Sequence, residues 1–294
     1  MTEQRKVGFI GLGDIGKPMA RRLVGSFDAH VFDLVEPAVE ELVAEGATAC
    51  ASVAQMAATC SYVGVCVRDD AQVESILYGD DGILENAGGS ITVAIHSTVT
   101  QANLLRWAAD AQEQGVRIVD APMTGGASKA ELGTLCYMVG GSDDDLADVS
   151  PVLETSAEKV VHAGELGAGI ALKLCNNFIQ YTEFVALAEA ARLAEACGLS
   201  LDVIHEVGMA NGVVNPQMHQ FVSGRNGLAP ACTEEQMEEI FGGHARLGRK
   251  DLECALATAS EKGVVMPTAE FIRDRIENVF LARDESRPAA CDQN

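Results

Sequence analysis

The chain has 294 residues, of which 48% are hydrophobic and 22% are charged, so it can bury one large core or two of ordinary size. Its 21 basic and 43 acidic side chains give a net charge of −22, which disfavours nucleic acid and membrane surfaces as partners. No apolar run approaches the ~18 residues of a membrane span, and we expect no signal peptide before the first strand. The nine cysteines are scattered without metal-site spacing, which predicts reduced thiols, a cytoplasmic protein and no metal site.

Short β-rich runs alternate with helical patterns through the first half of the chain. The predicted strands are Val7–Ile10, Ala29–Phe32, Tyr62–Val67, Ile91–His96 and Arg117–Asp120, with Leu135–Val139 and Lys159–His162 extending the same sheet. Helices are predicted between the strands, for example at Pro18–Gly25, Pro37–Glu45 and Gln101–Gln114. Strands that alternate with helices of this length form βαβ units, so we predict an α/β domain with a doubly wound parallel sheet of Rossmann type.

The pattern changes near Gly164–Gly169, after which the chain is helical to about residue 282. A long helix is predicted from about Ile170 to Cys197, and Gly198 is a plausible stop. We therefore predict a dinucleotide-binding domain over residues 1–163 and an all-α domain over residues 164–294. The last residues, Asp284–Asn294, have no periodic pattern and are expected to form a loose tail.

The first predicted strand leads into a segment with the spacing G-x-G-x-x-G. The segment comprises Gly11, Leu12, Gly13, Asp14, Ile15 and Gly16. In this strand-to-helix context, the first glycine permits a tight turn, the second lets a pyrophosphate approach the backbone, and the third lets the helix pack on the strand. The helix N-terminus supplies positive potential that the acidic chain otherwise lacks. The segment predicts a dinucleotide-binding loop, with a glycine-rich turn of an unrelated α/β fold as the alternative.

An acidic residue, Asp33, follows the second predicted strand, about 20 residues beyond Gly13. A carboxylate at this position accepts hydrogen bonds from the adenosine ribose hydroxyls and repels a 2′-phosphate. The sequence therefore predicts NAD rather than NADP as the cofactor.

Four motifs occur in a specific order along the chain. They are the cofactor segment Phe9–Ala20, the segment Asp120–Gly126, the helix start Gly167–Asn177, and the late segment Lys250–Leu252. In this order they resemble the β-hydroxyacid dehydrogenase family, which includes 3-hydroxyisobutyrate dehydrogenase and tartronate semialdehyde reductase. The resemblance extends from about residue 6 to about residue 282, with Ile15 where the family usually has methionine.

The resemblance implies a role for several residues. It implies Lys173 as the catalytic acid/base, Asn177 as its partner, and Thr124, Gly125 and Gly126 as the clamp on a substrate carboxylate. It places Val67, Arg68, Thr98 and Lys250 in contact with the cofactor. Two residues depart from the family pattern. Arg68 follows Val67 at a position where the family usually has a Leu-Pro pair. Thr124 replaces the usual serine, which could narrow the choice of substrate.

Hydride transfer between an alcohol carbon and nicotinamide leaves one proton on oxygen, which a positioned lysine can accept or donate. Lys173 and Asn177 are one helical turn apart and share a face. To act as a base near neutral pH, Lys173 needs a pKa below its usual value of about 10.4, and burial and a helix N-terminus both lower it. The apolar neighbours Leu172, Leu174, Cys175, Phe178 and Ile179 predict a buried segment, against the alternative of a surface lysine.

The predicted activity is hydride transfer between NAD and a small 3-hydroxy acid, such as 3-hydroxyisobutyrate, or its semialdehyde. The alternatives are an NADPH-dependent aldehyde, semialdehyde or imine reductase of the same fold, and a non-catalytic NAD-binding protein. Asp33 argues against the NADPH enzymes, and Lys173 argues against imine reductases, which typically lack that lysine. His244 and Arg246 are expected at solvated helix positions, outside the site. The apolar helices and the resemblance imply a homodimer or homotetramer.

Overall fold

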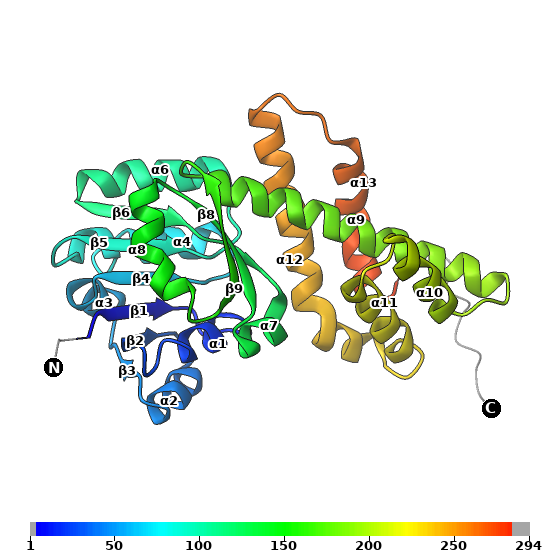
Figure 1. Cartoon of the computed structure of the whole chain (residues 1–294), viewed down its shortest axis with the longest axis horizontal. Helices are drawn as coiled ribbons and strands as arrows, with labels where there is room; N and C mark the ends of the chain where they lie inside the picture. The colour runs from blue at the N-terminus through cyan, green and yellow to red at the C-terminus, as the bar shows by residue number, and fades with distance from the viewer. Residues whose placement is uncertain (1–3, 284–294) are drawn as a thin grey trace. The chain divides into compact units, whose positions relative to one another are not determined.

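A computed structural model describes residues 4–283, which divide into two compact units, one ending at Lys173 and the other beginning at Leu174 (Figure 1). The strands all belong to the first unit, whereas the second unit is helical. The prediction of a Rossmann-type α/β region followed by an all-α region is therefore confirmed. The predicted loose tail, Asp284–Asn294, lies outside the described residues.

The first unit is built around a nine-stranded sheet in the order β3-β2-β1-β4-β5-β6-β8-β7, with β9 paired to β8. The strands are β1 (Lys6–Ile10), β2 (Asp28–Phe32), β3 (Thr48–Ala49), β4 (Tyr62–Val65), β5 (Ile91–Ile95), β6 (Val116–Asp120), β7 (Met123–Thr124), β8 (Leu135–Gly140) and β9 (Ala157–Gly164). All residues of β4 and β5 are buried, as expected for strands that helices cover on both faces.

The sheet is parallel from β3 to β6 but not throughout. β8 runs antiparallel to both β6 and β7 and parallel to β9. The predicted parallel sheet is confirmed from β3 to β6. β8 departs from it because the chain returns through β7 and the short helix α7 (Gly126–Leu132) rather than through a crossover helix that would place β8 parallel to β6. The short strands β3 and β7 were not predicted, since each has only two residues.

The remaining helices of the first unit connect its strands. They are α1 (Gly16–Arg21), α2 (Glu36–Ala44), α3 (Val53–Thr59), α4 (Asp70–Leu77), α5 (Ile83–Asn86), α6 (Gln101–Glu113) and α8 (Asp143–Leu153). Local capping sets several of their starts. Ser52 and Asp69 accept the N–H groups of Gln55 and Gln72, and Ser142 forms a capping box with Asp145.

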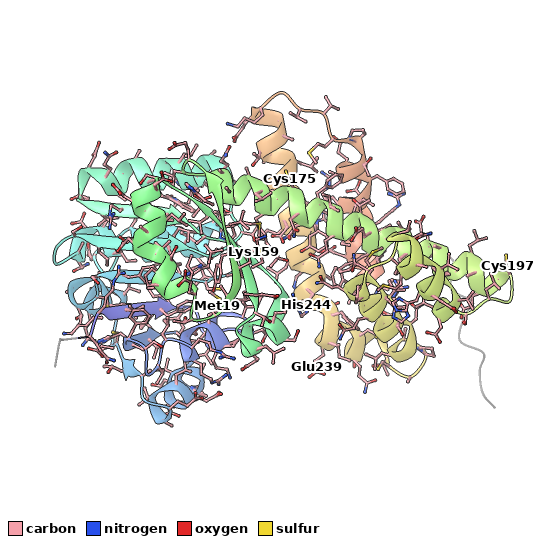
Figure 2. The ribbon with its side chains drawn as sticks, viewed as in Figure 1. Met19, Lys159, Cys175, Cys197, Glu239 and His244 are labelled. Atoms are coloured by element: carbon pink, nitrogen blue, oxygen red, sulfur yellow. The ribbon has the colours of Figure 1, made fainter. Side chains whose placement is uncertain are left out.

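The long helix α9 (Ala168–Ala196) begins in the first unit and continues in the second. The second unit then contains α10 (Leu201–Asn211), α11 (Pro216–Leu228), α12 (Glu234–Glu261) and α13 (Pro267–Phe280). Its core includes the stacked rings of Phe184 and Phe221, 4.3 Å apart, with Phe280 against Phe221 at 4.7 Å. His244 and Arg246 are exposed on α12, as predicted (His244 is labelled in Figure 2).

The cysteines between residues 4 and 283 are free thiols. Over the same residues, no helix is long and apolar enough to cross a membrane, and no group of three or more His, Cys, Asp or Glu side chains is arranged to hold a metal ion.

Candidate active site

In the glycine loop between β1 and α1, each of the three glycines lies in a different steric environment. Gly11 has a φ of +94°, and a Cβ there would lie 2.2 Å from the carbonyl oxygen of Cys66. A Cβ on Gly16 would lie 1.9 Å from the carbonyl oxygen of Gly11, so only glycine lets the helix begin this close to the turn. A Cβ on Gly13 would meet nothing within 4 Å, so the space beside this glycine is open and a ligand can approach its backbone. The loop fits a dinucleotide whose pyrophosphate contacts the backbone at Gly13.

The Asp33 carboxylate joins the end of β2 to this loop. Its Oδ2 accepts a hydrogen bond from the Leu12 N–H at 2.6 Å, and its Oδ1 accepts one from the Val35 N–H at 2.8 Å. A carboxylate has about four acceptor positions, so these two bonds fix its direction and leave capacity for ribose hydroxyls. In the loop itself, Asp14 is exposed and Ile15 is half-buried before the first turn of α1.

The ends of β4 and β5 lie at the same edge of the sheet as the glycine loop. β4 was predicted to reach Val67 but ends at Val65, because the Val67 N–H donates to the Ser97 hydroxyl at 2.9 Å instead of continuing the ladder. The Arg68 N–H donates to the Gln72 side chain at 2.9 Å, and the Arg68 side chain is exposed. Thr98 is half-buried in the segment after β5. Carboxyl ends of parallel strands are where α/β folds bind ligands.

The predicted carboxylate clamp lies at the β7–α7 junction. Thr124 ends β7 and is half-buried, and Gly125 and Gly126 follow with φ values of +133° and +71° that favour glycine. α7 packs against α1, the helix that follows the glycine loop (Figure 1). Arg21 of α1 pairs with Glu131 of α7 at 3.1 Å. The structure therefore places Thr124–Gly126 and the glycine loop at the starts of two neighbouring helices of one unit.

Lys173 lies in α9 where the first unit ends. The prediction that its whole segment is buried was wrong: Leu172 is 40% exposed and Ile179 is 57% exposed, while Lys173 is half-buried. Only one face of the helix packs, with Ile170 and Leu174 buried. The apolar composition therefore does not by itself identify Lys173 as a buried lysine.

In the second unit, Asn177 and Lys250 meet at a residue that sequence reasoning missed. Asp251 is buried, and its Oδ2 accepts hydrogen bonds from Asn177 Nδ2 at 2.7 Å and from the Tyr181 hydroxyl at 3.0 Å. Lys250 Nζ lies 3.0 Å from Asp251 Oδ1. Burial and the neighbouring carboxylate raise the pKa of Tyr181 well above its usual value, so this hydroxyl stays a donor. Asp251 lies in the late segment Lys250–Leu252, but a separation of 74 residues along the chain gives no sign that it orients Asn177.

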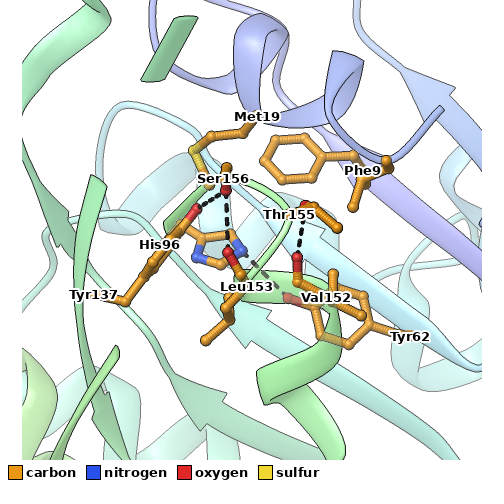
Figure 3. A pocket seen from close by; sticks show the side chains of 10 residues that line it. Phe9, Met19, Tyr62, His96, Tyr137, Val152, Leu153, Thr155 and Ser156 are labelled. Atoms are coloured by element: carbon orange, nitrogen blue, oxygen red, sulfur yellow. Dashed lines mark hydrogen bonds between the residues drawn. The ribbon is translucent and has the colours of Figure 1, made fainter. Parts of the chain in front are cut away.

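A buried cluster around His96 lies against the segment Asp120–Gly126 of the first unit. His96 Nδ1 donates to the Ala121 carbonyl at 2.8 Å, and its Nε2 lies 3.4 Å from the Tyr62 hydroxyl. Tyr137 and Ser156 share a hydroxyl hydrogen bond of 2.7 Å beside it, around a cavity of about 10 Å³ (Figure 3). Burial, partly opposed by the Ala121 hydrogen bond, lowers the pKa of His96 to about 4. His96 is therefore a neutral structural donor.

The pKa of His96 predicts an acid-sensitive stability. Because the folded-state pKa of about 4 lies below the unfolded value of about 6.5, protons bind preferentially to the unfolded chain as the pH falls through this window. We expect His96 to account for a loss of roughly 3 kcal/mol of unfolding free energy between pH 7 and pH 4. Denaturant unfolding across this range should show a shallower pH dependence for His96→Gln than for the exposed control His244→Gln. Equal pH dependence in both variants would contradict the assignment.

Family profiles match almost the whole chain. The family described as "NAD binding domain of 6-phosphogluconate dehydrogenase" matches residues 6–164. The family described as "NAD-binding of NADP-dependent 3-hydroxyisobutyrate dehydrogenase" matches residues 167–287. NAD-binding regions thus cover both the sheet-containing part and the helical part, which agrees with the fit of the glycine loop to a dinucleotide.

Curated relatives and a solved structure share this organisation. An uncharacterised oxidoreductase of Mycobacterium tuberculosis is 37% identical over 281 residues, covering 93% of this chain and 92% of the relative. The 2-(hydroxymethyl)glutarate dehydrogenase of Eubacterium barkeri is 33% identical over 273 residues, covering 91% of this chain and 86% of the relative. The structure of M. tuberculosis 3-hydroxyisobutyrate dehydrogenase with L-serine matches with a TM-score of 0.80 and 26% identity, covering 96% of this chain and all of that chain.

These matches confirm the resemblance carried by the four motifs. They extend over both units of the chain. The chain therefore belongs to the 3-hydroxyisobutyrate dehydrogenase family of β-hydroxyacid dehydrogenases, which are NAD(P)-dependent oxidoreductases.

Proposed function

We propose that this protein is an NAD-dependent dehydrogenase of small 3-hydroxy acids, acting on the hydroxy acid or its semialdehyde. The observation that carries the proposal is the Asp33 carboxylate, fixed by the Leu12 N–H beside the open backbone face of Gly13. This arrangement favours an unphosphorylated adenosine ribose, because a 2′-phosphate would bring negative charge towards a fixed carboxylate.

The residues proposed to hold NAD belong to the glycine loop, to the segments that follow β2, β4 and β5, and to α12. They are Gly11, Leu12, Gly13, Asp14, Ile15, Gly16, Asp33, Val67, Arg68, Thr98 and Lys250. NAD, when bound, supplies the nicotinamide that exchanges a hydride with the substrate carbon. The chain itself must position the substrate, exclude water and move one proton.

Lys173 is the proposed acid/base for that proton. In the oxidising direction its neutral amine accepts the hydroxyl proton, and in the reducing direction its ammonium returns a proton to the carbonyl oxygen. Asn177 is its proposed partner, since its Nδ2 is already held by Asp251 at 2.7 Å and its orientation is thereby fixed. Thr124, Gly125 and Gly126 are proposed to bind the substrate carboxylate through a hydroxyl and exposed backbone N–H groups.

The names of the relatives support a substrate class. 3-Hydroxyisobutyrate, 2-(hydroxymethyl)glutarate and L-serine all carry a hydroxymethyl group on the carbon next to a carboxylate. They differ only in the third substituent on that carbon, which is a methyl, a carboxyethyl or an ammonium group. We propose that the substrate of this chain has the same HO–CH2–CHR–COO⁻ unit. R is the third substituent, and we propose that side chains of the substrate pocket determine which R is accepted.

The test follows nicotinamide reduction with NAD and, separately, NADP over a panel of hydroxy acids. The panel contains 3-hydroxyisobutyrate, 2-(hydroxymethyl)glutarate, 3-hydroxypropionate, serine, glycerate and threonate. We expect NAD-dependent turnover of at least one compound, with a lower kcat/KM for NADP. NADPH-dependent reduction of aldehydes or imines without hydroxy-acid turnover would favour the reductase alternative, and NAD binding without any turnover would favour a non-catalytic protein.

We also propose that the protein is a cytoplasmic homodimer or homotetramer. The free thiols support a reducing compartment. α9 and α10 of the second unit leave large apolar side chains uncovered, with Leu193 69%, Val207 60% and Val203 45% exposed. Such surfaces mark interfaces in proteins that are otherwise rich in charge. Sedimentation velocity at assay concentration should show a dimer or tetramer, and a monomer would contradict this proposal.

A further inference from the structure

A buried carboxylate connects the segment Asp120–Gly126 to the first turn of α9. Asp120 ends β6 and is fully buried. Its Oδ1 accepts the Gly167 N–H at 2.8 Å, and its Oδ2 accepts the Ile170 N–H at 2.7 Å. Burial raises the pKa of Asp120, while these hydrogen bonds oppose the rise. Because both oxygens accept from N–H groups, the geometry fits the ionised form.

The backbone around Asp120 is shaped to admit this carboxylate. A Cβ on Gly140 would lie 2.3 Å from Asp120 Oδ1. A Cβ on Gly169 would lie 2.3 Å from the Met138 carbonyl oxygen and 2.9 Å from Asp120 Oδ2. Glycine at both positions therefore lets β6, β8 and the start of α9 approach the carboxylate closely. Gln101 of α6 supports the same turn by donating to the Gly167 carbonyl at 3.0 Å.

Two motifs with different proposed roles thus meet at one side chain. Asp120 opens the segment that ends in Thr124–Gly126, and Ile170 lies three residues before Lys173, about one helical turn. A carboxylate at the start of a helix also offsets the positive end of the helix dipole. Its charge therefore favours the protonated form of a lysine in the next turn.

We infer that Asp120 is a positioning residue for the reaction, whose charged cap on the first turn of α9 sets both the placement and the protonation of Lys173 relative to the Thr124–Gly126 clamp. This inference rests on the proposed acid/base role of Lys173. Asp120 itself touches neither the substrate nor the reacting atoms in this proposal, and it acts only through α9.

The helices and strands around Asp120 carry other ionisable side chains, and within residues 4–283 none of these side chains forms a hydrogen bond or ion pair with Asp120. They are Arg106, Asp110 and Glu113 of α6, Arg117 of β6, Cys136 and Tyr137 of β8, Glu158, Lys159 and His162 of β9, and Glu165 before α9. Several have partners elsewhere: Arg106 pairs with Glu74, Arg117 with Asp148, and His162 bonds the Gly141 carbonyl. Asp120 is a charged group that the first turn of α9 contacts directly, through the Gly167 and Ile170 N–H groups.

The test compares Asp120→Asn with the matched control Gln101→Ala, which removes a neutral contact to the same turn. In the oxidising direction, activity rises with pH as Lys173 loses its proton. We expect Asp120→Asn to move this limb to lower pH by about 0.5–1 pH unit, because removal of the carboxylate charge disfavours the ammonium form. The variant should also lower kcat with an unchanged KM for NAD, and faster amide exchange at Gly167 and Ile170 should accompany both effects. Gln101→Ala should leave the limb in place.

A second substitution keeps the test decisive if the amide variant does not fold. Asp120→Ser also removes the charge while keeping one acceptor, and it should shift the limb in the same direction. A lower melting temperature with an unshifted limb, or the failure of both variants to fold, would assign Asp120 to stability alone and overturn the inference. If Lys173→Ala retains normal turnover, the proposed function fails instead, whatever the Asp120 variants show.

Discussion

Replacing Lys173 by alanine is expected to lower kcat by about 10²- to 10⁴-fold, the usual contribution of a positioned general acid or base. The substitution removes the only group proposed to exchange a proton with the substrate oxygen. It leaves the glycine loop and the Asp33 contact to Leu12 intact, so the affinity for NAD should stay within a few-fold of the original. Steady-state kinetics measure kcat, and isothermal titration calorimetry measures the affinity for NAD.

A matched lysine separates the chemistry from a general effect of charge. Lys159 is exposed on β9 of the same unit, and Lys159→Ala removes an equal charge without touching α9 (Lys159 is labelled in Figure 2). We expect its kcat to be normal. Lys173→Arg should remain impaired, because a guanidinium keeps the charge but does not give up its proton. Turnover of Lys173→Ala near that of the original enzyme would show that another group handles the proton.

Periodicity predicted the elements that a long, uniform pattern defines. The buried runs at β4 and β5 and the extended helix α9 each contain enough residues to show their pattern. β7 and α7 do not, because a strand of two residues and a helix of seven residues between positive-φ glycines are too short to show a period. The antiparallel direction of β8 follows from this short connection, so the sequence pattern did not predict where the parallel sheet changes direction.

For the candidate site, local motifs predicted residues but not their partners. Glycine spacing predicted Gly11, Gly13 and Gly16, because their G-x-G-x-x-G pattern lies within six consecutive residues. Asp251 and Asp120 act across separations of 74 and 50 residues, which only the folded backbone sets. The buried segment around Lys173 was inferred from composition, yet Ile179 is 57% exposed. Composition counts apolar side chains and does not show which face of a helix is covered.

Replacing Asp33 by asparagine is expected to reduce the preference for NAD over NADP by on the order of 100-fold, measured as the ratio of the two kcat/KM values. Two effects act together. The neutral amide loses the charge that repels a 2′-phosphate, which at about 5 Å and an effective dielectric constant near 20 corresponds to about 3 kcal/mol. It also weakens acceptance from ribose hydroxyls, so kcat/KM for NAD should fall as that for NADP rises.

The structure also predicts how the loop itself responds. The single amide oxygen in Asp33→Asn would serve either the Leu12 N–H or the Val35 N–H, which Asp33 now binds at 2.6 and 2.8 Å, but not both with a carboxylate's strength. We therefore expect a modest loss of thermal stability beside the change in cofactor choice. Glu36→Gln removes the same charge from an exposed position in the first turn of α2 and should change neither quantity. The contrary result is an Asp33→Asn variant that keeps the melting temperature and the ratio of kcat/KM for NAD to that for NADP. That result would mean that Asp33 only contacts the loop and that another feature selects the nucleotide.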